Sequence, residues 1–283
     1  MTGSDKPVMA PEDFRLFQEF ATELIGLVLD AGKESYLALK LLPRLEELRL
    51  ASFADYYGYL KFAPRCGEER RQFISLITNN ETYFFREEAQ LRVLSEEILP
   101  RLKERKVARR ARKLHIVSAG CSSGEEVYTL AMLLLESGSF IWDWDVVITG
   151  VDVDPRVLGR ARAGIYPQRS FQTTPARFIE RYFRPCEDGF AIKEVLRRST
   201  RFVEGNLLQF DGAVDGPPVD IIFCRNVLIY FSDETIKQIT DSFGRVLVPE
   251  GYLFLGHSES LSRITARYAP LRFPGAIVYR KRE

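Results

Sequence analysis

The chain has 283 residues, and 46% of them are hydrophobic, which is enough to bury the core of one large domain or two smaller ones. Forty basic residues nearly balance 39 acidic ones, giving a net charge of +1. A dedicated nucleic-acid binder usually carries a clear basic excess, so the composition argues against that class. No run approaches the roughly 18 apolar residues that span a bilayer, and we therefore predict no membrane insertion.

Cysteines and histidines are few and scattered. No two of the four cysteines form a CxxC pair, which is typical of a reducing compartment and argues against a disulfide scaffold. The first twelve residues lack the charged-then-apolar order of a secretory signal. We therefore predict a cytoplasmic protein. The only two histidines, His115 and His257, lie far apart, which argues against a metal site.

Residues 13 to about 112 are predicted to be helical. Apolar side chains recur every three and four positions in Phe14, Phe17, Phe20, Leu24 and Val28. The stretch from Leu37 to Leu50 repeats the pattern, and no strand pattern precedes residue 114. We predict an N-terminal helical domain over residues 1–85 and a helical linker over residues 86–113.

From residue 114 to the end, short apolar runs alternate with helical segments. This alternation predicts parallel βαβ units, and therefore an α/β sheet covered on both faces. The last two runs have no helix of normal length between them, which favours an antiparallel hairpin at one sheet edge. Residues 166–199 interrupt the alternation and predict an inserted β subdomain, with a hairpin turn near Asp188–Gly189. The predicted strands are Leu114–Ser118, Val146–Val151, Arg201–Val203, Asp220–Cys224, Tyr252–Leu255 and Ala276–Tyr279, and the predicted helices are Glu125–Glu136, Arg156–Ala163 and Asp233–Leu247.

Two candidate sites follow the first two strands. The turn Ser118–Glu126 is rich in small residues and opens a helix, so its backbone can approach a ligand closely. Asp152 ends the second strand, where a carboxylate is placed to accept hydrogen bonds from ribose hydroxyls. For Asp154 we favour a different role, the cap of the helix that Pro155 begins.

Two further motifs have a structural alternative. The run Arg225–Phe231 follows a strand end, but Tyr230 and Phe231 are also consistent with aromatics that pack a helix. The run Thr78–Glu87 combines polar residues, an aromatic pair and Arg86, and by itself it is consistent with a helix cap.

Taken together and in this order, the motifs resemble the chemotaxis receptor methyltransferases, the CheR family. The resemblance extends from about residue 15 to the end. The motifs that carry it are Asn80-x-Thr82-x-Phe84–Phe85–Arg86, the turn Ser118–Glu126, Asn206–Leu207–Leu208, the run Phe223–Phe231 and Gly256–His257–Ser258–Glu259–Ser260.

The resemblance implies a class I S-adenosylmethionine methyltransferase sheet, Rossmann-like, with an N-terminal all-helical domain and a small inserted β subdomain. It implies a protein-glutamate O-methyltransferase that esterifies glutamates on the cytoplasmic domain of chemoreceptors. Arg86 and Tyr230 would form the active-site pair. Glu125 would meet the methionine amino end of the cofactor and Asp152 its ribose. The full set of implied cofactor contacts is Asn80, Thr82, Arg86, Glu125, Asp152, Asn206, Leu207, Asn226 and Val227.

The expected substrate fits the scarcity of histidines, because a glutamate carboxylate has a reference pKa near 4.3 and needs no general base at neutral pH. Relatives that dock on a receptor's C-terminal pentapeptide have a longer hairpin than Arg184–Gly189. We therefore predict no pentapeptide tether, and we predict a monomer. The basic segment Arg101–Lys113 is interpreted as a solvated linker helix, with docking of an acidic substrate as the alternative.

Other readings stay open from the sequence. The same chemistry can serve a receptor pathway unrelated to motility, and genomic neighbours would distinguish the two. A regulatory module that only binds S-adenosylmethionine is a second alternative. An amine substrate is disfavoured, because Asn226–Tyr230 differs from the Asn-Pro-Pro-Tyr type expected for amine methylation.

Overall fold

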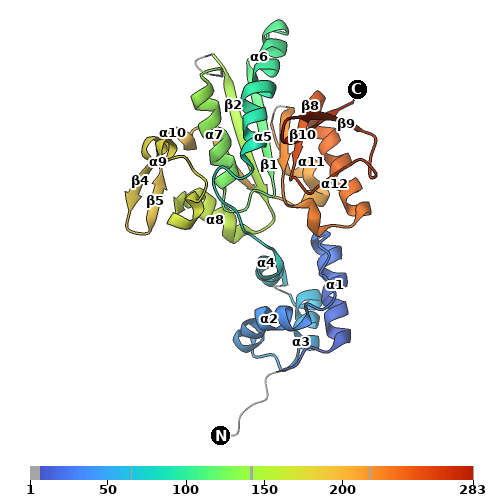
Figure 1. Ribbon diagram of the computed structural model, residues 1–283. Coiled ribbons are helices and arrows are strands. Elements are labelled where there is room, and N and C mark those ends of the chain that lie inside the picture. Colours follow the sequence, from blue (N-terminus) through green and yellow to red (C-terminus); the bar gives the residue numbers. More distant parts are fainter. Residues whose placement is uncertain (1–6, 65, 141–142, 217, 283) are drawn as a thin grey trace. The chain divides into compact units, whose positions relative to one another are not determined.

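The computed structural model describes residues 7–64, 66–140, 143–216 and 218–282. Residues 1–6, part of the stretch considered above for a secretory signal, lie outside this description. The chain forms two compact units (Figure 1). One contains the residues up to Asn79 together with Tyr230–Ser232, and the other contains Asn80–Ile229 and the chain from Asp233 onward. The domain limits proposed from the sequence stay a prediction.

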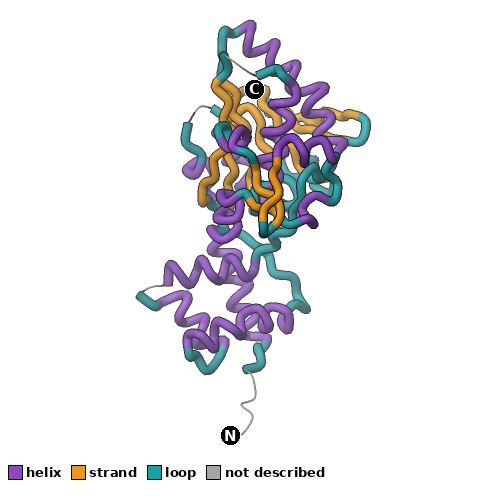
Figure 2. The backbone as a smooth tube through the Cα atoms, turned by 90° about the vertical axis from the view of Figure 1, so that its left-hand side faces the viewer, coloured by secondary structure: helices purple, strands orange, loops and turns teal. Residues whose placement is uncertain are grey.

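The first unit is helical. It consists of α1 (Pro11–Ile25), α2 (Glu34–Leu48), α3 (Phe53–Phe62) and α4 (Cys66–Ile77). Proline at the first position starts α1, and Gly26 ends it in a left-handed conformation that suits glycine. Phe14, Phe17 and Phe20 of the predicted stripe are buried, whereas Val28 lies beyond the end of α1 and is exposed. The Phe17 ring packs against Tyr56 and Phe73. Figure 2 shows only helices and loops in the described part of residues 7–79.

A buried carboxylate joins three of these helices through an ion pair and a hydrogen bond. Glu69 of α4 is 5% exposed and accepts hydrogen bonds from both Arg44 of α2 and Tyr56 of α3. Burial, followed by the bond to Glu69, raises the pKa of the Tyr56 hydroxyl well above its usual value, so it stays a donor. The carboxylate thereby has partners on both oxygens, as a buried charge requires.

The return of the chain at Tyr230–Ser232 completes the helical unit. Leu27 and Phe231 form an isolated antiparallel bridge, and the Val28 amide donates to the Tyr230 carbonyl at 2.9 Å. The Asn79 side chain donates to the Tyr230 hydroxyl at 2.9 Å. The backbone of Tyr230 and Phe231 therefore pairs with the segment that follows α1.

The second unit contains a seven-stranded sheet in the order β6-β2-β1-β7-β8-β10-β9. The first five strands in this order are parallel. All six residues of β7 are buried, as expected for a strand covered on both faces. The strands are β1 (Lys113–Ala119), β2 (Asp145–Asp152), β6 (Thr200–Glu204), β7 (Val219–Cys224), β8 (Leu247–Leu255), β9 (Tyr268–Phe273) and β10 (Ala276–Lys281).

One edge of the sheet differs from the expectation. Strand β10 pairs antiparallel with β8, but the two do not form the predicted hairpin, because an additional strand, β9, lies between them in the chain and forms the outer edge. The sequence analysis missed β9 because Pro270 and Arg272 break its apolar run and its burial alternates. Such alternation is usual for an edge strand with one solvated face.

Helices connect the strands. The predicted helices correspond to α7 (Glu125–Ser137), α8 (Pro155–Ala163) and α12 (Asp233–Val246). A continuous helical run precedes β1 and includes a short π-helical turn. It comprises α5 (Glu88–Val93), the π turn Leu94–Ile98 and α6 (Leu99–Ala108). Shorter helices are α10 (Glu194–Arg197), α11 (Phe210–Ala213) and the 3₁₀ turns Gln168–Phe171, Leu207–Gln209 and Leu228–Tyr230.

The predicted insertion is a small antiparallel sheet. Its strands are β3 (Ile165–Tyr166), β4 (Phe183–Cys186) and β5 (Gly189–Ile192), with α9 (Ala176–Tyr182) before β4. The hairpin turns at Glu187 and Asp188, where the sequence predicted it. Phe84 is fully buried against Phe171 and Phe183, so the segment that enters the second unit is anchored to this subdomain.

The basic segment is largely paired within the chain. Lys106 contacts Asp220 at 2.7 Å, with side chains 15% and 3% exposed, and Arg105 donates to the Glu250 carbonyl. Arg101, Arg112 and Lys113 also have acidic neighbours. These contacts favour a structural role for most of the segment. No helix in the described ranges is long and apolar enough to cross a membrane.

Replacing Lys106 with methionine is expected to lower the free energy of unfolding by about 3–5 kcal/mol, because it leaves Asp220 buried without its cation. Denaturant unfolding measures this loss. The exposed Arg109 at the end of α6 serves as the control, and its replacement with methionine should change stability little. A Lys106→Met protein of unchanged stability but raised KM for an acidic substrate would instead support docking.

Candidate active site

The turn after β1 is fixed by its neighbours. The amides of Gly120 and Cys121 both donate to the Val151 carbonyl of β2, at 2.8 and 3.0 Å. Gly120 has a φ of +77°, and a Cβ there would lie 2.6 Å from a methyl carbon of Val227, which follows β7. Only glycine fits, so the turn lies close against the ends of two strands.

Asp152, at the end of β2, faces this turn. Its carboxylate is 8% exposed and accepts hydrogen bonds from the amides of Ser122 at 2.7 Å and Asp154 at 2.9 Å. The two bonds go to different oxygens, so each oxygen keeps acceptor capacity for ligand hydroxyls. Burial raises the pKa of Asp152 to about 6, although the amide bonds oppose this shift. Asp154 caps α8 through the Arg156 amide, which confirms its predicted role.

Asn206 and Leu207 lie beside Asp152. The Gly205 amide donates to the Asp152 carbonyl at 2.9 Å, which holds the end of β6 against the end of β2. The Asn206 side chain caps the 3₁₀ turn that follows by accepting from the Leu208 amide at 3.0 Å. Leu207 is 8% exposed. The structure thus brings the predicted ribose and adenine residues together at adjacent strand ends.

Glu259 organises the end of β7. One of its oxygens accepts from the amides of Val227 at 2.9 Å and Leu228 at 2.7 Å, and the other accepts from Asn226 at 3.0 Å and Gly256. Burial raises the pKa of this carboxyl, and the amide bonds oppose the shift. The sequence analysis quoted Glu259 in a motif but gave it no role.

Asn226 fits a ligand at this position. It has a left-handed φ of +59°, and its side-chain oxygen is buried without a hydrogen-bond partner among the described residues. A buried acceptor that lacks a donor is costly, so a bound molecule with an N–H or O–H would satisfy it. The open acceptors of Asp152 and Asn226 therefore match a ligand that carries hydroxyl and amino groups.

Arg86 lies on a strained segment. Its neighbours Phe85 and Glu87 both have a φ of +60°, a conformation that costs a non-glycine residue about 1–3 kcal/mol. The Arg86 guanidinium donates to the Glu81 carbonyl at 3.3 Å and lies 5.5 Å from the centre of the Tyr83 ring. No acidic side chain in the described part of the chain forms an ion pair with it. A carboxylate ligand would supply that partner.

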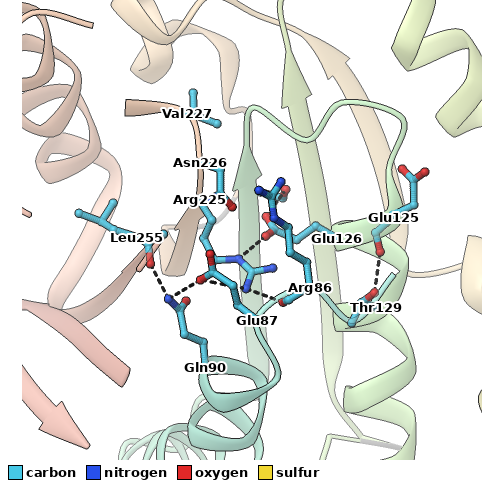
Figure 3. Close-up of polar contacts among 12 residues, drawn as sticks. Arg86, Glu87, Gln90, Glu125, Glu126, Thr129, Arg225, Asn226, Val227 and Leu255 are labelled. Atoms are coloured by element: carbon cyan, nitrogen blue, oxygen red, sulfur yellow. Dashed lines mark hydrogen bonds and ion pairs between the residues drawn. The ribbon is translucent and has the colours of Figure 1, made fainter. Parts of the chain in front are cut away.

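Glu125 lies apart from this cluster. Figure 3 shows its carboxylate pointing away from Arg225, whereas the adjacent Glu126 points toward Arg225. Glu125 is 2% exposed and accepts from the hydroxyls of Ser123 at 2.7 Å and Ser170 at 3.2 Å, and burial raises its pKa. It lines a cavity of about 600 Å³ together with Asn80 and Thr82.

Asn80 connects the cavity to the turn after β1. Its side chain donates to Asp154 at 3.0 Å, and its carbonyl accepts from the Ser122 hydroxyl at 3.0 Å. Tyr230, in contrast, belongs to the helical unit, where it lines a cavity of about 350 Å³ with Lys33 and Leu37. The pairing of Tyr230 with Arg86 stays a prediction.

The parallel sheet, the turn after β1 and the acid at the end of β2 form an arrangement that suits a ligand with ribose hydroxyls, as in nucleotide-binding α/β folds. Comparison with known families makes this specific. The all-alpha domain of the CheR methyltransferases matches residues 12–78, and their S-adenosylmethionine-binding domain matches residues 80–275. The chain belongs to the CheR methyltransferase family. The resemblance, fold class and cofactor predicted from the sequence are confirmed.

Relatives are similar along nearly their whole length. The chemotaxis protein methyltransferase 2 of Vibrio cholerae is 36% identical, with 97% of this chain and 94% of that protein covered. The chemotaxis protein methyltransferase 2 of Pseudomonas aeruginosa is 37% identical, with 88% of this chain and 86% of that protein covered. The chemotaxis protein methyltransferase of Escherichia coli is 32% identical, with 94% of this chain and 90% of that protein covered. The solved N-methyltransferase NodS of Bradyrhizobium japonicum is 15% identical with a TM-score of 0.37 over 67% of this chain and 91% of that chain, a likeness too weak to bear on function.

The predicted ribose contact of Asp152, together with its raised pKa, predicts a pH dependence of cofactor binding. Only the ionised carboxylate offers all its acceptors, and it is lost as the pH falls through about 6. The Kd for S-adenosylhomocysteine should therefore rise about tenfold between pH 7.5 and pH 5. Calorimetric titration of wild type and Asp152→Asn measures this, with circular dichroism as the check on folding. Asp152→Asn should bind S-adenosylhomocysteine weakly, with a Kd that does not vary with pH. A Kd of the wild type that does not vary with pH would contradict the ribose role of Asp152.

Proposed function

We propose that this methyltransferase esterifies glutamate side chains on the cytoplasmic domain of chemoreceptors, as a monomeric cytoplasmic enzyme. The observation that carries the proposal is the environment of the Arg86 side chain. Its guanidinium is half-buried, has no acidic partner in the described ranges and sits on a segment bonded to the strand ends. A carboxylate substrate would supply the missing charge. The names of the relatives point to the same substrate class.

The residues at the strand ends would hold the cofactor. Asp152 would accept bonds from the ribose hydroxyls, and Asn206 and Leu207 would flank the adenine. Asn226 and Val227 would close the pocket, while Asn80, Thr82 and Glu125 would line the end that takes the methionine amino group. S-adenosylmethionine supplies a methyl group made electrophilic by its bond to a sulfonium.

The chain's own contribution to the reaction would be positioning. A glutamate with a reference pKa near 4.3 is ionised at neutral pH, so one carboxylate oxygen can attack directly. That oxygen would take the methyl group, the electron pair of the broken C–S bond would stay on sulfur, and no proton would need to move. Arg86 would orient the carboxylate, and alignment of this kind contributes about 7–11 kcal/mol in well-oriented reactions. The assignment of Tyr230 to the same step rests on the resemblance.

The decisive test uses methyl-labelled S-adenosylmethionine and the cytoplasmic fragment of a chemoreceptor. We expect label on the fragment that mild base releases as methanol, because carboxyl methyl esters are base-labile and N-methyl groups are not. A fragment with its glutamates replaced by alanine is the control and should stay unlabelled. Base-stable label would point to an amine substrate, and cofactor binding without any label would favour a regulatory module.

The same assay tests the predicted independence from a receptor tail. The hairpin between β4 and β5 turns with only two residues, Glu187 and Asp188. We propose that this turn is too short to add a peptide strand as longer hairpins do. Removing the last five residues of the receptor fragment should therefore leave kcat/KM unchanged, whereas a large loss would contradict the proposal.

A further inference from the structure

A buried charge cluster connects Arg86 to the ends of the central strands (Figure 3). Arg225 directly follows β7, and its side chain is only 3% exposed. The guanidinium Nε donates to Glu126 of α7 at 2.6 Å, and Nη1 donates to the carbonyl oxygen of Arg86 at 2.8 Å. Arg225 therefore bonds to the backbone of the residue that would meet the substrate.

The carbonyl held by Arg225 lies at the centre of the strained segment. Arg86 stands between Phe85 and Glu87, both with left-handed backbones. Strained conformations of this kind persist only where surrounding contacts hold them. The Phe85 amide donates to the Thr129 hydroxyl at 3.2 Å on one side. On the other side of Arg86, the Glu87 carboxylate accepts a hydrogen bond from the Gln90 side chain at 2.8 Å. The bond from Arg225 holds the peptide between these two anchors.

The charges also require an arginine here. Arg225 lies between Glu126 and Glu87, and both carboxylates are only 14% exposed. His257 contacts Glu87 from the outside at 3.0 Å and is itself exposed. The planar guanidinium reaches the carboxylate and the carbonyl in two directions at once, whereas a lysine ammonium is a compact point charge on a flexible stem. A lysine would retain the charge and lose one of the two bonds.

We propose that Arg225 is a positioning residue for methyl transfer. It fixes the strained peptide after Arg86 and thereby holds the Arg86 guanidinium where the substrate carboxylate must lie. It acts through Arg86, and no role in contact with substrate or cofactor is assigned to it. The proposal rests on the function proposed above, because it needs Arg86 to orient a carboxylate.

The first test is Arg225→Lys, assayed by methyl transfer to a chemoreceptor cytoplasmic fragment. We expect kcat to fall by up to about 100-fold, the loss that a displacement of about 1 Å can cause. The KM for the fragment and the Kd for S-adenosylhomocysteine should stay unchanged. The matched control is Arg44→Lys, which alters a buried arginine–glutamate pair in the helical unit. It should lower the thermal midpoint without lowering kcat.

A double-mutant cycle separates positioning from general destabilisation. In an Arg86→Ala background, Arg225→Lys should have no further effect on kcat, because the group it positions is gone. If Arg225→Lys does not fold, Thr129→Val loosens the same segment from its other anchor and should give the same non-additive loss. Additive losses, or a wild-type kcat in Arg225→Lys, would overturn the proposal. Absence of base-labile label with the wild type would instead overturn the proposed function.

Discussion

Replacing Arg86 with alanine should lower kcat about 30–150-fold, because hydrogen bonds to a charged group contribute roughly 2–3 kcal/mol when they act in the transition state. Arg86→Lys should retain part of the rate, since it keeps the charge without the two-pronged geometry. Single-turnover methyl transfer to a receptor fragment measures the chemical step.

The resemblance also places Arg86 near the cofactor, so the Kd for S-adenosylhomocysteine must be measured on the same samples. A loss of affinity that accounts for the whole effect would reassign Arg86 from the substrate to the cofactor. Arg92 is the matched control, because it is an exposed arginine on α5 only six positions along the chain. Arg92→Ala should behave as the wild type, and an Arg86→Ala enzyme with wild-type kcat would exclude the orienting role.

Replacing Glu259 with glutamine should have the second large effect, on the cofactor pocket as a whole. The carboxylate accepts four backbone amides, from Asn226, Val227, Leu228 and Gly256. Glutamine has nearly the same shape, but its NH₂ group would face two of those donors. Two buried donors without acceptors cost about 2–6 kcal/mol. We expect the Kd for S-adenosylhomocysteine to rise more than about 100-fold, because the loop carrying Asn226 must rearrange.

Calorimetric titration and thermal unfolding of the same sample would separate the two consequences of Glu259→Gln. Glu88→Gln is the matched control. Glu88 is exposed, so this substitution makes the same chemical change without removing buried hydrogen bonds. Wild-type affinity in Glu259→Gln would show that the amides find other acceptors and that Glu259 does not shape the pocket.

The sequence predicted those parts of the fold that leave a local signal. Strands β1, β2 and β7 were predicted because each is a continuous apolar run that ends at a turn. The cap at Asp154 was predicted because Pro155 follows it, and the hairpin turn because Asp188–Gly189 is a turn pair. Strand β9 was not predicted, because Pro270 and Arg272 interrupt its apolar run. Only its pairing with β10 identifies it as a strand.

The candidate site divides in the same way. Asp152 and Asn226 were predicted because carboxyl ends of parallel strands meet at one edge. Asn206 was predicted only from the resemblance to the CheR family. Glu259 and Arg225 received no role, since their bonds to Asn226 and Arg86 connect residues 33 and 139 positions apart. Periodicity within a window cannot detect such bonds. The pairing of the Tyr230 carbonyl with Val28 is hidden for the same reason.

That pairing also determines how this protein can be divided or recombined. A fragment beginning at residue 80 would lack Leu27 and Val28, so Tyr230 would lose the donor to its carbonyl and Phe231 its bridge partner. The helical unit is therefore discontinuous along the chain. A chimera that exchanges only residues 1–79 with a relative would combine one protein's Leu27 with the other protein's Phe231. To exchange the helical unit between relatives, two separate segments of the chain would have to be replaced, and the second would comprise only residues 230–232.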